Sequence, residues 1–67
     1  MRKGTDEAIK WYLYDVIRKG DFDDPLTGET DLTSAAESCF VEFSDIPDSD
    51  ERPYEIAFEV AKKLGKV

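Results

Sequence analysis

Apolar residues recur at helical spacing in a first segment, from about Asp6 to Lys19. Thr5 is a good N-cap residue, and Gly20 is a typical stop after the last helical turn. The residues that share one stripe of this segment are Ile9, Leu13, Val16 and Ile17, with Tyr12 at its flank. The pattern therefore predicts an amphipathic helix that buries this stripe.

A second helix is predicted from about Thr33 to Phe43. Ser34 and Glu37 have the spacing of a capping box, so Ser34 is expected to cap the helix, although Asp31 or Thr33 would also serve. The apolar residues that share a face here are Leu32, Ala36, Cys39, Phe40 and Phe43. Phe40 lies at the centre of this face and is expected to be buried.

A third helix is predicted from about Pro53 to Leu64. Pro53 suits the first helical turn, with Asp50 or Glu51 before it, and Gly65 follows the end. Its apolar stripe holds Tyr54, Ala57, Val60, Ala61 and Leu64, with Ile56 and Phe58 at the edges. Leu64 is expected to be buried between the helices.

These three segments predict an all-α fold, a small three-helix bundle in which residues 1–67 form a single helical domain. An up-down-up arrangement would place the two connections at opposite ends of the bundle. Phe22 and Leu26 of the first connection are expected to fold back over the core, and a brief strand there is left open. Ile46 is expected to pin the second connection.

Charge is distributed unevenly along the chain. The net charge is −7, but positions 21–59 hold 13 carboxylates and a single base, Arg52, which is a net charge of −12 for this stretch. Such a field repels nucleic-acid and membrane phosphates and attracts basic partners. We therefore expect no direct nucleic acid binding and no membrane binding.

Cysteine content and apolar runs indicate the compartment. Cys39 is the single cysteine, so no intramolecular disulfide can form, which favours a reducing cytoplasm. No apolar run approaches the roughly 18 residues of a membrane span. The chain is therefore expected to be cytoplasmic.

The residue types that catalysis and metal binding favour are scarce. The chain has no histidine, and Cys39 lies mid-helix on an apolar stripe without a base to activate it. The acidic run 21–24 fits no calcium loop, because Leu26 or Pro25 takes a required position in either register. We expect no enzyme, no catalytic residue, no cofactor and no metal site.

Two aromatic residues lie opposite the apolar stripe of the first helix. At 100° per residue Trp11 and Tyr14 project away from that stripe, and Glu7 and Arg18 share their face. Trp, Tyr and Arg are the residue types enriched in binding hot spots. The N-terminal residues or the C-terminal tail would cover this face in one interpretation. In a second, the helix is buried on two sides. In a third, the face contacts a protein partner or forms a homodimer, and in a fourth its exposure is incidental.

The sequence thus favours a small acidic, non-catalytic protein-interaction module that uses the aromatic face of its first helix. The alternative is a DNA-mimic inhibitor that occupies the site of a nucleic-acid-binding protein with its carboxylates. The acidic surface residues in the two connections are Asp21, Asp23, Asp24, Asp48, Asp50 and Glu51.

Overall fold

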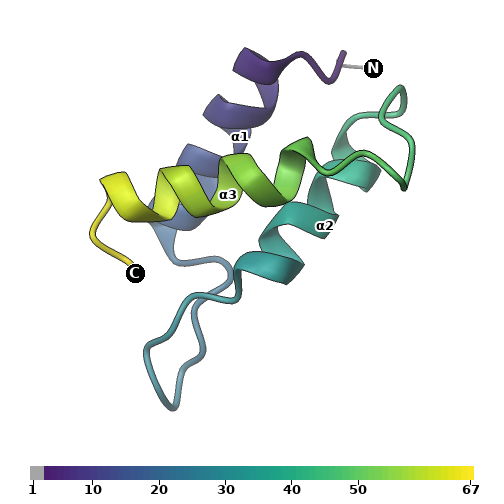
Figure 1. Cartoon of the computed structure of the whole chain (residues 1–67). Helices are drawn as coiled ribbons and strands as arrows, with labels where there is room; N and C mark the ends of the chain where they lie inside the picture. The colour runs from purple at the N-terminus through teal and green to yellow at the C-terminus, as the bar shows by residue number, and fades with distance from the viewer. Residues whose placement is uncertain (1–2) are drawn as a thin grey trace.

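The computed structural model describes residues 3–67 and contains three α-helices, as the apolar pattern predicts. They are α1 (Asp6–Lys19), α2 (Leu32–Glu42) and α3 (Arg52–Lys63), and each packs against the other two (Figure 1). The predicted all-α three-helix fold is confirmed. The bounds of α1 agree with the prediction, and α2 and α3 each begin and end one residue earlier than expected.

The ends of α1 follow directly from its flanking residues. The hydroxyl of Thr5 accepts a hydrogen bond from the amide of Ala8 at 3.1 Å, which satisfies one of the free N–H groups of the first turn. Gly20 adopts a left-handed conformation with φ +82°, and its amide donates to the carbonyl of Ile17. Both predicted caps are confirmed.

The start of α2 differs from the predicted capping box. Asp31 is the N-cap, and its carboxylate accepts from the amide of Ser34 at 3.0 Å and from the Ser34 hydroxyl at 2.8 Å. These two bonds hold the pKa of Asp31 below its usual value. The predicted capping box of Ser34 and Glu37 is therefore wrong, and the alternative cap, Asp31, is confirmed. A carboxylate has two acceptor oxygens and serves the amide and the hydroxyl together.

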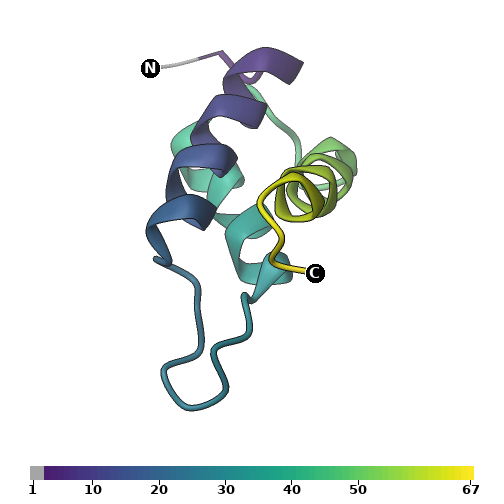
Figure 2. The ribbon, with the colours of Figure 1, turned by 90° about the vertical axis from the view of Figure 1, so that its left-hand side faces the viewer.

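The first connection forms a short hairpin-like loop below α1 and α2 (Figures 1 and 2). Asp23 and Thr30 form an isolated antiparallel bridge, so a minimal strand pairing is present. Phe22 packs against the core as expected, but Leu26 is 93% exposed, and its expected burial is wrong. The Asp24 carboxylate accepts from the Leu26 amide at 2.8 Å, which builds a turn with Leu26 near its tip.

The third helix crosses the other two instead of running antiparallel to its neighbour, so the expected up-down-up arrangement is wrong. Figure 1 shows α3 lying across α1 and α2, and Figure 2 views it nearly end-on. It has more extensive contacts with α1 and α2 than they have with each other. Four fully buried alanines allow this close approach: Ala35, Ala36, Ala57 and Ala61.

The core lies between the three helices and contains the whole predicted stripe of α1. Phe43 is its largest fully buried side chain, and Ile46 of the second connection is also buried in this core, as predicted. Phe40 and Leu64 are only half-buried, so their predicted central positions are wrong. Because α3 crosses α2, the Phe40 ring instead contacts the exposed ring of Tyr54, with centroids 6.2 Å apart.

Tyr12 joins α1 to α2 at the edge of this core. Its ring meets Phe43 edge-on, with centroids 5.7 Å apart and planes at 84°. Its hydroxyl donates to the Ser38 hydroxyl at 2.9 Å, and Ser38 in turn donates to the carbonyl of Ala35 at 2.6 Å. The polar end of this half-buried aromatic residue is therefore satisfied without water.

Candidate interaction surface

The α1 outer face, which we define by Glu7, Trp11, Tyr14 and Arg18, carries the most exposed aromatic residue of the described chain. Trp11 is 60% exposed. Its ring is met edge-on by Tyr14, with centroids 6.0 Å apart and planes at 67°, and the Lys10 ammonium lies 5.7 Å from its centroid. The indole is therefore oriented by its neighbours on the same helix and still presented to solvent.

Tyr14 is less exposed than the helical wheel predicts. It is half-buried and packs against the core cluster, while Trp11 and Arg18 are exposed. A long ring on the flank of a helix can reach back to the core beneath it. Tyr14 therefore serves as a support for Trp11 as well as a member of the face.

The chain termini do not cover Trp11 in the described residues. The amide of Gly4 donates to the Asp45 carboxylate at 2.7 Å, which holds the N-terminal segment against the second connection. Lys66 binds Asp23 at 2.9 Å, which holds the C-terminal segment beside the first connection. Cover by residues 1–2 lies outside the described residues.

Charges at the C-terminal end of this face form local pairs. Asp15 lies 3.4 Å from Arg18 and 3.1 Å from Lys19, and the hydrogen bond from Lys19 is the main reason that the pKa of Asp15 is lowered. All three side chains are about half exposed, so these pairs add little to stability. Arg18 therefore keeps the freedom to turn toward a partner.

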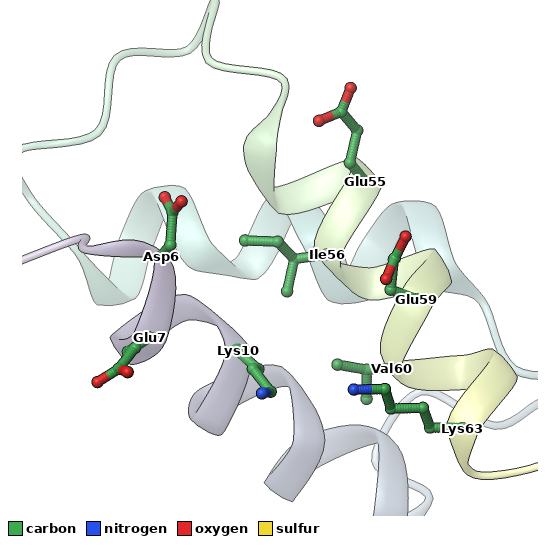
Figure 3. A pocket seen from close by; sticks show the side chains of 8 residues that line it. All are labelled: Asp6, Glu7, Lys10, Glu55, Ile56, Glu59, Val60 and Lys63. Atoms are coloured by element: carbon green, nitrogen blue, oxygen red, sulfur yellow. The ribbon is translucent and has the colours of Figure 1, made fainter.

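A groove between α1 and α3 adjoins the α1 outer face, and the sequence pattern did not reveal it. Half-buried Ile56 and buried Val60 form its apolar part. Charged side chains from both helices line the rest of the groove, as Figure 3 shows: Asp6, Glu7, Lys10, Glu55, Glu59 and Lys63. The position of Ile56 at the edge of the α3 stripe was the available signal.

The six predicted acidic surface residues fall into two separate groups. Three of them, Asp21, Asp23 and Asp24, lie in the first connection. The other three lie in the second connection, at the opposite end of α2 (Figure 1). Asp23 accepts from the Thr30 hydroxyl at 2.6 Å and binds Lys66, and both contacts lower its pKa. The structure therefore does not bring the six carboxylates together on one surface.

A clasp around Arg52, which the sequence analysis did not predict, joins α3 to the start of α1. The Arg52 guanidinium lies 2.6 Å from the Asp50 carboxylate and 2.7 Å from the Asp6 carboxylate. The backbone amide of Arg52 also donates to the Asp50 carboxylate at 2.9 Å. The Arg52 side chain is the main reason that the pKa of Asp50 is lowered, and both carboxylates raise the pKa of Arg52. Asp6, one of the residues that line the groove, is therefore held in an ion pair with α3.

Asp50→Asn is expected to lower the thermal midpoint at pH 7, with Asp48→Asn as the control because Asp48 is exposed and has no ion-pair partner in residues 3–67. A lowered carboxyl pKa stabilises the fold above the unfolded value of about 3.9 and loses that effect as the pH falls through the folded value. The difference between wild type and Asp50→Asn should therefore shrink below about pH 4. Thermal unfolding at a series of pH values measures this difference in midpoint. Equal midpoints for Asp50→Asn and Asp48→Asn at pH 7 would show that the Arg52 clasp does not stabilise the fold.

Cys39 is unsuited to nucleophilic chemistry. It is fully buried, and burial, with a smaller effect of Glu42, raises the pKa of its thiol to about 11. The thiolate, which is the reactive form, is therefore scarce at neutral pH. Within residues 3–67, no three carboxylate, cysteine or histidine side chains gather in a way that could hold a metal ion.

The comparisons with known proteins add no assignment. No protein-family model, curated protein or solved structure matches the chain. None of the helices within residues 3–67 has the length and apolarity needed to cross a membrane. The functional argument therefore depends on the surface itself.

Proposed function

We propose that this chain is a small non-catalytic interaction module that binds another protein through the α1 outer face. The observation that carries the proposal is Trp11, which is 60% exposed yet held by Tyr14 and Lys10. A Trp side chain supplies a large contact area at low cost in conformational entropy, and Trp, Tyr and Arg dominate binding hot spots. We place the module in the cytoplasm because Cys39 has no disulfide partner in the chain.

The charge of the chain favours a different protein over a second copy. A net charge of −7 makes two copies repel each other, and the same charge repels nucleic acid. We therefore propose a partner with a basic contact surface and no direct binding of nucleic acid. DNA mimicry ranks behind this proposal, since the acidic residues lie in two groups and Asp23 and Asp50 are engaged within the chain.

The proposal is tested with Trp11→Ala. The exposed position of Trp11 predicts that the variant stays folded, with the free energy of unfolding changed by less than about 1 kcal/mol. Binding should weaken more than about fivefold, the equivalent of the 1 kcal/mol that marks a hot-spot residue. The partner is captured from the source cells, purified, and titrated against both proteins by calorimetry.

Val41→Ala is the matched control, because Val41 is an apolar residue of α2 that is 85% exposed. Its affinity for the purified partner should equal that of the wild type. Equal affinities for Trp11→Ala and Val41→Ala would overturn the proposal. If sedimentation equilibrium shows that the wild type is a dimer and that Trp11→Ala is a monomer, the partner is a second copy of this chain and not a different protein.

A further inference from the structure

We infer that the groove between α1 and α3 accepts a basic amphipathic helical segment of the partner protein. The inference rests on the proposed function, because the α1 wall of the groove shares Glu7 with the α1 outer face. Lys10 also lines the groove and lies 5.7 Å from the Trp11 centroid. A segment in the groove would therefore be within reach of the indole.

The apolar part of the groove comes from α3. Ile56 and Val60 are one turn apart on the helix and project toward α1 (Figure 3). Ile56 is half-buried, so part of its side chain is available to a ligand. Val60 is only 2% exposed, so the apolar face of an amphipathic helix would pack chiefly on Ile56.

The charge around the groove indicates that the bound helix carries positive charge. Four carboxylates face two lysines among the residues that line it. The Asp6 carboxylate is paired with Arg52, but the side-chain carboxylates of Glu7, Glu55 and Glu59 have no ion-pair or hydrogen-bond partner within residues 3–67. Lysine or arginine side chains beside the apolar face of a partner would supply the missing counter-charges.

The lysines leave one end of the groove acidic. In Figure 3 Lys63 reaches from α3 toward α1 at the end where Lys10 lies, while Asp6 and Glu55 lie at the other end. Asp6 is occupied by Arg52, and the next residue of α1, Glu7, also lines the groove, so the basic residues of the bound segment are expected near Glu7 on α1 and Glu55 on α3. These two carboxylates are the ones to test, because neither contributes to an internal ion pair in residues 3–67.

The test uses a synthetic Leu/Lys peptide of about 18 residues, long enough to form a helix with one apolar face. A peptide of the same composition with its leucines spread around the helix is the ligand control. Calorimetry at about 0.15 M salt gives the affinities, and NMR shifts locate the site. We expect the amphipathic peptide to bind more tightly than its control and to perturb Ile56 and Val60.

The double variant Glu7→Gln/Glu55→Gln should weaken this binding by about 2- to 30-fold, the range for losing two exposed charge pairs. Asp21→Asn/Asp48→Asn removes the same charge from exposed sites outside the groove. Its effect should stay below about twofold, since salt screens charges beyond roughly 8 Å. Equal weakening by both double variants would overturn the inference in favour of diffuse attraction.

Phe58→Ala separates the groove from the neighbouring exposed aromatic residues of α3. Phe58 is 52% exposed and does not line the groove. If Phe58→Ala weakens binding of the peptide and Glu7→Gln/Glu55→Gln does not, the peptide does not bind in the groove. Trp11→Ala with the natural partner tests the α1 outer face separately. If Glu7→Gln/Glu55→Gln weakens peptide binding but Trp11→Ala leaves partner binding unchanged, only the proposed role of the α1 outer face is overturned.

Discussion

Phe43→Ala is expected to lower the free energy of unfolding by about 3–5 kcal/mol, the range for removing a buried phenylalanine. Phe43 is fully buried, and its ring is the one that Tyr12 meets edge-on across α1 and α2. A chain of this length has roughly 3–10 kcal/mol of stability in total. The variant should therefore lose a large part of the stability of the fold, as measured by urea denaturation followed by circular dichroism.

Val41→Ala again supplies the control, in the last turn of α2 and two residues before Phe43, the C-cap residue of that helix. Val41 is 85% exposed, so its truncation should change the free energy of unfolding by less than about 0.5 kcal/mol. If the two variants unfold at the same urea concentration, Phe43 does not lie in the core that we describe.

Ala57→Phe should destabilise the fold by about 3 kcal/mol or more, at the upper end of the cost of overpacking. Ala57 is fully buried where α3 crosses the other helices, and a ring at this position would force the helices apart. The fall in thermal midpoint should exceed about 12 °C for a domain of this size.

Lys62→Phe places the same ring on the exposed side of α3. It should leave the midpoint within a few degrees of the wild type, about the change that 0.5 kcal/mol produces. Should Ala57→Phe be as stable as Lys62→Phe, the close crossing of α3 would be wrong.

The candidate surface was only partly open to prediction from the sequence. The helical wheel placed Trp11 opposite the buried stripe, and its exposure agrees with that. The wheel also placed Tyr14 there, yet Tyr14 is half-buried, because a wheel gives the direction of Cβ and not the reach of the ring. The groove beside them depends on the pairing of α1 with α3, residues some 50 positions apart, which no local pattern contains.

Local chemistry by itself determined the three helices. Thr5, Gly20 and Pro53 mark helix ends through their own hydrogen-bonding capacity and backbone preferences, and the stripe of α1 follows from the helical period. Only the tertiary structure decided how the helices cross. Small alanines on α2 and α3 let α3 lie across both neighbours, since close packing depends on the joint shape of surfaces far apart in the chain. That crossing left Phe40 and Leu64 at the margin of the core and created the groove beside Trp11.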